Sequence, residues 1–371
     1  MIEPTSRALE GAYRGRRVLV TGHTGFKGGW LVAWLSALEA QVWGFALPAP
    51  TSPSFFLDAD VAGACRHHVG DVRDLEAVRR VVRESRPEVV FHLAAQSLVR
   101  ASYEAPVETL ATNVMGTAHV LEALRLEGQR SAVVVVTSDK CYENREWTHG
   151  YRESDALGGH DVYSSSKAGA ELVAQSWRRS FFPASRHPEH GVAIATARAG
   201  NVIGGGDWAA DRIVPDAIRA LEAGRPVPMR NPGAVRPWQH VVEPLGGYLL
   251  LGARLLGPHA THCTKAWNFG PAPQAAVPVS ALVAEVVRAW GAGCAELAQQ
   301  PQAPHEAGLL RLSIDQAVAE LSWAPRWSLP EAVGHAVAWY RARHAGLRGA
   351  ALRHVALDQC RAWLQVTGQG A

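Results

Sequence analysis

From residue 16 to about residue 200, apolar positions switch repeatedly between two spacings, which predicts strands and helices in alternation. Short apolar runs rich in valine are typical of strands buried on both faces of a parallel sheet. Between them, apolar residues recur every three or four positions; Leu75, Val78 and Val82, for example, share one face of a helix. The expected strands are 16–21, 41–47, a short one at Val69, 88–94, 132–137 and 192–198, and the expected helices are 27–38, 75–85, 113–126 and 162–182.

After Gly204 the alternation stops, because prolines become frequent and short helices, expected at 213–223 and 279–290, are separated by loops. The whole pattern indicates an α/β fold, with a doubly wound parallel sheet followed by a smaller mixed α/β lobe. The expected division is a tail (1–15), a sheet domain (16–200), a second lobe (201–341) and a helical extension (342–371). A later segment, about 236–270, is an optional further part of the sheet domain.

Composition narrows the class of protein further. Of the 371 residues, 47% are hydrophobic and 19% are charged, which supplies a large core and excludes a disordered chain. A net charge of +3 without a basic block does not indicate a nucleic-acid binder. The polar residues 1–15 contain no signal-peptide core, so we expect a cytoplasmic protein. The five scattered cysteines are expected to be reduced, and no metal site is expected.

A glycine-rich turn follows the first expected strand, with Gly22, Gly25 and Gly28 ahead of the helix at 27–38. Glycine suits this place because the chain turns tightly there and because a diphosphate must approach the backbone closely. Backbone N–H groups at the start of the helix then attract the phosphates. The GxxGxxG spacing resembles the extended short-chain dehydrogenase/reductase superfamily, whose members have a Rossmann-type fold and bind NAD or NADP.

This resemblance implies where a dinucleotide would bind. Asp71 would accept a hydrogen bond from adenine, and residues 93–96 would let the cofactor cross the sheet edge. Residues 47–50 offer neither an acid for a ribose 2′-hydroxyl nor an arginine for a 2′-phosphate, so NAD is favoured, with Thr51 or Ser52 contacting the ribose. The implied NAD ligands are Gly22, Thr24, Gly25, Phe26, Lys27, Gly28, Asp71, Val72, Leu93, Ala94, Ala95, Gln96, Asn113, Tyr163 and Lys167.

Tyr163 and Lys167 are four residues apart on an expected helix, so both side chains lie on one face. A tyrosine with a pKa near ~10 is a poor base at neutral pH. An ammonium one turn away favours the phenolate and is expected to lower that pKa. Ser138, which follows the strand at 132–137, is the expected third catalytic member and would bond the same substrate oxygen. Asn113 either positions this site or caps its own helix.

Two ionisable residues, Asp139 and Lys140, follow Ser138 directly. The run 137–144 resembles nucleotide-sugar 4,6-dehydratases, and its lysine, where thymidine-sugar relatives have glutamate, resembles the CDP-glucose 4,6-dehydratase branch. The resemblance implies an NAD-dependent hydro-lyase that converts CDP-D-glucose to CDP-4-dehydro-6-deoxy-D-glucose and water. Asp139 is the expected acid for the leaving 6-hydroxyl. Lys140 is the expected base at carbon 5; if it stays charged, it instead stabilises an enolate and a water is the base.

Runs within residues 198–241 are similar to the same branch, and the resemblance covers about residues 14–341. The diphosphate of a nucleotide sugar needs a cationic partner, and the planar fork of arginine binds two of its oxygens. Arg212 and Arg236 are the expected partners. The triplet Gly204–Gly206 either adjoins the substrate or is only a flexible turn. The expected substrate ligands are Ser97, Asn201, Asp207, Trp208, Arg212, Arg236, Trp238 and His240.

Members of this superfamily commonly pair through two helices, here 113–126 and 162–182, so we expect a homodimer or a larger homo-oligomer. His305 lies in another similar run and is expected to be a packing residue. The expected partners are therefore a nucleotide sugar, CDP-glucose, and a second copy of the chain, without nucleic acid or membrane.

Two other functions fit parts of this pattern. A nucleotide-sugar 4-epimerase of the same superfamily would return hydride to carbon 4 and would not need Asp139 and Lys140. A non-catalytic sensor of dinucleotides would need only the glycine turn. The presence of Ser138, Tyr163 and Lys167 together argues against the sensor.

Overall fold

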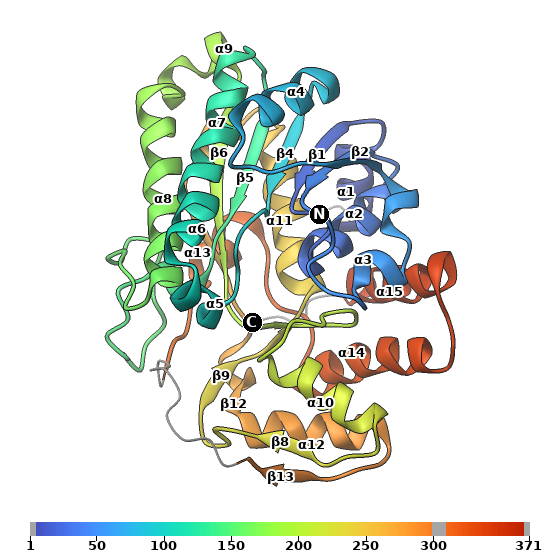
Figure 1. The fold of residues 1–371 in the computed structure, drawn as a ribbon. Helices are drawn as coiled ribbons and strands as arrows, with labels where there is room; N and C mark the ends of the chain where they lie inside the picture. Colours follow the sequence, from blue (N-terminus) through green and yellow to red (C-terminus); the bar gives the residue numbers. More distant parts are fainter. Residues whose placement is uncertain (1–4, 299–308, 367–371) are drawn as a thin grey trace.

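The computed structural model describes residues 5–298 and 309–366, arranged as a sheet domain with a smaller lobe beside it (Figure 1). The central sheet has seven strands, all parallel, in the order β3-β2-β1-β4-β5-β6-β11. This confirms the doubly wound α/β fold expected from the sequence. The strands are β1 (Arg17–Thr21), β2 (Gln41–Ala46), β3 (Arg66–Val69), β4 (Val89–His92), β5 (Ala132–Val136), β6 (Ala193–Ala199) and β11 (Ala266–Phe269).

Both faces of the sheet are covered, because successive side chains of each strand point to opposite sides. Val18 and Val20 of β1 pack into one hydrophobic cluster, and Leu19 between them packs into the other. Helices α2, α11, α14 and α15 contribute to the first cluster, and α4, α7 and α8 to the second. The helices of this domain are α1 (Thr5–Tyr13), α2 (Phe26–Ala37), α3 (Phe55–Asp58), α4 (Leu75–Ser85), α5 (Val99–Glu104), α6 (Pro106–Leu110), α7 (Gly116–Leu126), α8 (Val162–Ser180), α9 (His187–His190) and α11 (Val242–Leu255).

Two stretches differ from their sequence-based expectation. The segment expected as a tail contains α1, because Leu9 and Tyr13, one turn apart, are both fully buried, and the Tyr13 hydroxyl donates to Leu249 O at 2.7 Å. The expected helix at 113–126 begins earlier, with a π-helical turn over Ala111–Met115. Such a turn widens the helix by one residue and is frequent at functional sites.

The smaller lobe is built from short elements, drawn at the bottom of Figure 1. Its strands form small two-stranded pairs, in which β12 runs antiparallel to β9 and β13 runs parallel to β8. Between these elements the chain returns to the large sheet through α11 and β11. The elements of this lobe are α10 (Ile213–Glu222), β8 (Val227–Met229), β9 (Val235–Pro237), β12 (Ala276–Pro278), α12 (Val279–Trp290) and β13 (Ala295–Leu297). The other elements after β6 are β7 (Val202–Ile203), β10 (Gln239–His240), α13 (Asp315–Leu321), which packs on β11, α14 (Leu329–His344), which packs on α12, and α15 (Gly349–Gln365), which packs on α2.

The last helix, α15, closes one face of the sheet domain. Trp363 is fully buried, and its ring lies edge-on to Trp34 of α2 with centroids 5.7 Å apart. The Arg326 guanidinium lies 4.0 Å from the Trp363 ring centroid, and Trp363 Nε1 donates to Glu243 Oε2 at 2.7 Å. Among the described helices, none has both the length and the apolar character to cross a membrane. The cytoplasmic location stays a prediction.

We expect Trp363→Ala to lower the free energy of unfolding by about 3–5 kcal/mol, because it empties a fully buried site and leaves Glu243 without one donor. Denaturant unfolding measures this change. His354→Ala, an exposed position on the same helix, is the matched control and should change stability by no more than about 0.5 kcal/mol. Equal effects of the two substitutions would contradict the packing role of α15.

Candidate active site

The expected site residues stand where β1, β4 and β5 end, at the edge of the sheet where the strand order reverses between β1 and β4. Open α/β sheets bind ligands in such a crevice. The glycine turn lies there, between β1 and the N-terminus of α2. Gly22 has φ +76°, and a Cβ on Gly28 would stand 2.1 Å from Gly22 O. Only glycine permits this cradle, which fits the diphosphate of NAD.

The cradle is tied to its surroundings by side chains next to the glycines. Thr24 Oγ1 donates to Leu47 O at 2.8 Å, which joins the turn to the end of β2. A Cβ on Gly22 would meet Ala94 N at 2.6 Å, so the turn also lies against the chain leaving β4. Phe26 packs against the hydrophobic core at the start of α2.

Asp71 and its neighbours form the other side of the expected cofactor site. Both carboxylate oxygens of Asp71 accept hydrogen bonds from Arg73, and this holds the pKa of Asp71 below its usual value. Val72 is buried, while Leu93, Ala95 and their neighbours at 93–96 are half-buried. If Asp71 accepts a hydrogen bond from the adenine amino group, its carboxylate would at the same time accept hydrogen bonds from Arg73.

Asn113 does not cap its helix, so that alternative is wrong, and its role in positioning the site stays a prediction. It lies within the π-helical turn, and α7 begins three residues later. Its side-chain amide donates to Gln96 O at 2.9 Å and to Ser166 Oγ at 2.8 Å, while Asn113 Oδ1 accepts from Gln96 N. Asn113 thus ties the segment after β4 to α8, the helix of Tyr163.

The catalytic candidates after β5 lie together with Tyr163. Tyr163 is hydrogen-bonded to Ser138, and Ser138 Oγ donates to Asp139 Oδ1 at 2.9 Å. All three side chains are buried. A Cβ on Gly200, after β6, would stand 2.5 Å from Asp139 Oδ2, so glycine there leaves room for the carboxylate. Lys140 lies at the partly exposed end of the same turn.

The pKa of Tyr163 does not follow the sequence-based expectation. Burial raises the pKa of Tyr163 to about 12, and the hydrogen bond with Ser138 and the charge of Arg212 oppose this rise. In the free protein the net pKa of Tyr163 therefore lies above its usual value, because loss of solvation outweighs the opposing hydrogen bond and charge. The effect of Lys167 on this pKa stays a prediction. Burial also lowers the pKa of Lys167 to about 8, so part of its ammonium charge is lost in mildly alkaline solution.

Lys27 and Arg212 add two cations to this cluster. Burial, together with the charges of Arg212 and Lys167, lowers the pKa of Lys27 to about 7, against the opposing charge of Asp139. Arg212 Nη1 donates to Asp207 Oδ2 at 2.9 Å, which holds the guanidinium beside the tyrosine side of the site. Lys27 was expected only as a cofactor ligand. Its ammonium also interacts electrostatically with the catalytic candidates Asp139 and Lys167.

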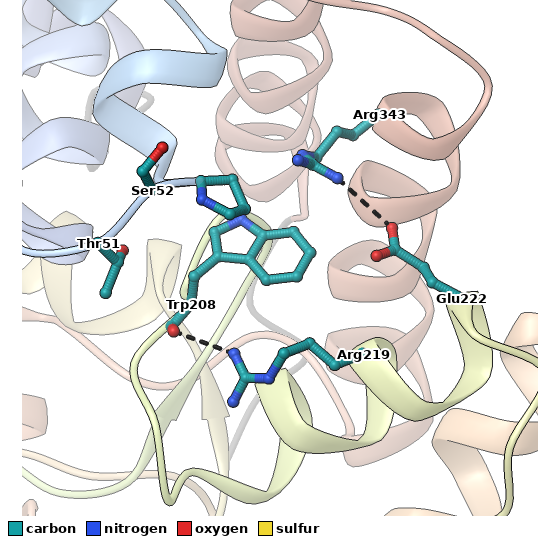
Figure 2. Close-up of a pocket in the computed structure, with 7 residues that line it drawn as sticks. Thr51, Ser52, Trp208, Arg219, Glu222 and Arg343 are labelled. Carbon is teal, nitrogen blue, oxygen red and sulfur yellow. Dashed lines mark hydrogen bonds and ion pairs between the residues drawn. The ribbon is translucent and has the colours of Figure 1, made fainter.

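Trp208 lies away from this cluster. It lines a hollow between the loop after β2, α10 and α14, together with Thr51 and Ser52 (Figure 2). The Arg343 guanidinium lies 4.6 Å from the centroid of its ring, and Arg219 Nη1 donates to its carbonyl oxygen at 3.0 Å. The structure therefore places Thr51 and Ser52 in the same hollow as Trp208, and their contact with the ribose stays a prediction.

The triplet Gly204–Gly206 is tightly packed, so its interpretation as a flexible turn is wrong. A Cβ on Gly205 would stand 2.2 Å from the Trp339 ring, and a Cβ on Gly206 would stand 2.6 Å from Phe55 Cβ. Tyr340 donates to the Asp207 carbonyl oxygen at 2.6 Å. Helix α14 thus holds the loop that carries the Arg212 partner Asp207.

The remaining substrate candidates are spread over different environments. His240 is fully buried between the rings of Trp30 and Trp327, so it is a core side chain, and its expected role as a substrate ligand is wrong. Trp238 is also packed in the core. Ser97 is exposed, Asn201 and Arg236 are half-buried, and His305 lies outside the described residues.

Glu171 and Arg198 were not among the expected site residues. They form an ion pair of 2.8 Å behind the catalytic side chains, with both side chains at most 4% exposed. The only local signal was spacing, since Glu171 follows Lys167 by four residues. Glu171 lies on α8, whereas Arg198 lies on β6, and no sequence pattern pairs the two residues.

Comparison with known proteins gives concordant matches. Residues 19–335 match the family described as GDP-mannose 4,6 dehydratase. A CDP-glucose 4,6-dehydratase of Salmonella typhimurium is 50% identical over 330 residues, which cover 89% of this chain and 92% of that protein. A dTDP-glucose 4,6-dehydratase of Mycobacterium tuberculosis is 33% identical over 49% of this chain and 52% of that protein.

Solved structures share the fold. A dTDP-glucose 4,6-dehydratase of Streptomyces venezuelae, solved with NAD bound, has a TM-score of 0.72 at 24% identity and covers 89% of this chain and 98% of that one. A UDP-glucose 4-epimerase of Thermus thermophilus, also in complex with NAD, has a TM-score of 0.73 at 25% identity, over 88% of this chain and 99% of that one.

We expect Gly28→Ala to weaken NAD binding at least ~10-fold, because the added methyl group would stand 2.1 Å from Gly22 O and open the cradle. Calorimetric titration with NAD measures the affinity. Gly11→Ala in α1, where the added Cβ meets no atom within 4 Å, is the matched control and should bind NAD normally. Wild-type affinity in Gly28→Ala would contradict the assignment of the cradle.

Proposed function

The chain belongs to the GDP-mannose 4,6 dehydratase family and is an NAD-dependent nucleotide-sugar 4,6-dehydratase, and from this premise we propose that its substrate is CDP-D-glucose. The product is then CDP-4-dehydro-6-deoxy-D-glucose, with release of water. The nucleotide is inferred from the Salmonella relative, because half of all aligned positions are identical over 89% of the chain.

The observation that supports this function most directly is the hydrogen-bonded row Tyr163–Ser138–Asp139 at the carboxyl edge of the sheet. An epimerase needs a base at the 4-hydroxyl only. A dehydratase also needs an acid for the 6-hydroxyl, and here a buried carboxyl group adjoins the serine that contacts Tyr163. The position of Asp139 therefore favours the dehydratase over the epimerase.

The reaction divides between cofactor and protein. NAD held at the glycine cradle would supply the hydride chemistry, as acceptor from carbon 4 and donor to carbon 6. Tyr163 removes the proton of the 4-hydroxyl, while Ser138 holds the same oxygen. Lys167 keeps a positive charge beside the developing phenolate.

The protein then completes the loss of water. The 4-ketone makes the proton on carbon 5 acidic, and Lys140 removes it, while Asp139 protonates the departing 6-hydroxyl. Lys140 gives a proton back to carbon 5 when hydride is added to carbon 6. Arg212 and Arg236 hold the substrate diphosphate. Residues 16–200 carry most of the NAD site, and residues 201–341 carry most of the sugar-nucleotide site.

The homodimer is part of the same proposal. Large apolar side chains remain exposed over α5, α6, the π-helical turn and α8, helices that lie together in Figure 1. Such a patch marks a protein interface more often than a bare surface. The residues are Tyr103 (49% exposed), Val107 (78%), Leu110 (43%), Met115 (50%) and Leu172 (54%). Sedimentation equilibrium tests the dimer, and a monomer at micromolar concentration would contradict it.

Incubation of the protein and NAD with CDP-glucose, dTDP-glucose, UDP-glucose and GDP-mannose, in separate reactions, tests the proposed function. We expect a 4-keto-6-deoxy product, identified by mass spectrometry, from CDP-glucose. Preferential turnover of another sugar nucleotide would overturn the choice of substrate. An altered hexose that retains its 6-hydroxyl would identify an epimerase.

We expect Tyr163→Phe to lower kcat at least ~100-fold, because the base at the 4-hydroxyl is lost and such groups contribute factors of about 10²–10⁴. KM should change little, since the phenol is not a diphosphate ligand. Steady-state rates with CDP-glucose measure both constants. Near-normal turnover would refute the assignment of Tyr163.

Lys140→Ala separates the two roles open to this lysine. If Lys140 is the base at carbon 5, the variant should lose exchange of the carbon-5 proton with deuterated solvent, while oxidation at carbon 4 continues. Mass spectrometry of the recovered sugar measures the exchange. Exchange near the wild-type rate would leave Lys140 as an enolate stabiliser with water as the base.

A further inference from the structure

A buried polar cluster lies directly behind the catalytic side chains, and the reaction described above does not use it. It consists of Glu171 on α8, Thr137 after β5, Thr196 and Arg198 on β6, and Tyr142 after the catalytic turn; we call it the Glu171 cluster. Each of these side chains is at most 5% exposed. Polar groups buried this deeply must be paired with one another to be tolerated.

The Glu171 carboxylate is the hub of the cluster. Thr137 Oγ1 donates to Oε1, while Thr196 Oγ1 donates to Oε2 at 2.7 Å and Arg198 Nη2 donates to Oε2 at 2.8 Å. Burial alone would raise the pKa of Glu171, but the charge and hydrogen bond of Arg198, with the two threonine hydroxyls, lower it below its usual value. Glu171 is therefore a fully paired carboxylate that joins one helix to two strands.

The cluster holds the catalytic turn at both ends. Thr137 immediately precedes Ser138, and Tyr142 immediately follows the turn that carries Asp139. Arg198 Nη1 donates to the Tyr142 hydroxyl at 2.7 Å, and its guanidinium lies 4.8 Å from the centroid of the Tyr142 ring. A displacement of Glu171 would therefore loosen the turn at both of these residues.

The same carboxylate holds the helix that carries the base. Tyr163, Lys167 and Glu171 follow one another at intervals of four residues in α8, so all three lie along one face. Neighbours at this interval are about 6 Å apart along the helix axis. Glu171 thus anchors the face of α8 that presents Tyr163 and Lys167 to the substrate.

We propose that Glu171 is a positioning residue for the 4,6-dehydration: it holds the face of α8 with Tyr163 and Lys167 against the turn with Ser138 and Asp139, and it supports the positive charge of Lys167. The inference rests on the proposed function for its reaction, and on the contacts of Glu171 for its geometry. It assigns Glu171 no contact with substrate or cofactor.

The electrostatic part concerns Lys167 and the charged groups around it. Burial lowers the Lys167 pKa, while Cys141 on the catalytic turn and Glu171 on the same helix raise it. Lys27 from α2 and His92 from β4 also lie within its field. Arg198 and Arg178 face Glu171. Removal of the Glu171 charge should therefore let Lys167 lose its proton at lower pH.

Two substitutions separate the charge of Glu171 from the length of its side chain: Glu171→Gln removes the charge, and Glu171→Asp shortens the side chain. For Glu171→Gln we expect kcat to fall about 10- to 100-fold with little change in KM, because misplaced catalytic groups cost factors of this size. The alkaline limb of kcat, which reports loss of the Lys167 ammonium, should move down by about one pH unit. Glu171→Asp keeps the charge but is one methylene shorter, so kcat should fall while the alkaline limb stays near its wild-type pH.

Glu243→Gln is the matched control, because Glu243 is 1% exposed and also accepts three N–H donors, from Arg326, Trp327 and Trp363. It makes the same side-chain substitution away from the catalytic turn, although burial raises the pKa of Glu243 to about 7, so less negative charge is removed than at Glu171. The pH profile should keep its wild-type shape. Thr196→Val, which removes one donor to Glu171, is a milder variant if Glu171→Gln does not fold. It should lower kcat severalfold.

Wild-type kcat and an unmoved alkaline limb in Glu171→Gln would overturn the inference. If that variant does not fold, wild-type kcat in both Glu171→Asp and Thr196→Val would overturn it. Nitrogen NMR of the Lys167 ammonium provides a readout that needs no turnover, and its pKa should fall in Glu171→Gln. If the wild type is inactive with every sugar nucleotide, the proposed function fails, whereas this NMR shift still decides the role of Glu171.

Discussion

A parallel sheet buried on both faces is the constraint on which this structure depends. Parallel strands need crossover connections, and these place helices on both sides of the sheet and bring every strand to its carboxyl end at one edge. The glycine turn after β1, the segment after β4 and the catalytic turn after β5 meet there for that reason. Residues more than 100 positions apart, such as Gly22 and Ser138, therefore face one crevice.

Close contact between glycines and aromatic rings holds the two lobes together. The chain has 13 tryptophans, and Trp30, Trp339 and Trp363 are among those that are fully buried. Trp339 fills the space over Gly205, and the ring of Trp363 lies over Gly246. The excess of tryptophan is thus largely explained by packing at the junction between the sheet and α14 and α15, and not by substrate contacts.

Charges buried behind the site are balanced before any ligand binds. Glu171 and Arg198 neutralise each other in the interior, Asp207 is paired with the half-buried Arg212, and the partly exposed Asp71 is paired with Arg73. Breaking such a buried pair costs more than the pair contributes, because the remaining charge stays buried without a partner. The Glu171–Arg198 pair is therefore formed by the folded chain itself and does not depend on a ligand.

Local spacing was sufficient to identify the alternation of strands and helices, the glycine turn, and the Tyr163–Lys167 pair, because each depends on neighbours within a few residues. Spacing could not show that His240 lies among aromatic rings, that Asn113 lies in a π-helical turn, or that burial raises the Tyr163 pKa. These outcomes, like the pairing of Glu171 with Arg198, depend on which distant segments pack together and on how much water they exclude. Only the folded chain decides both.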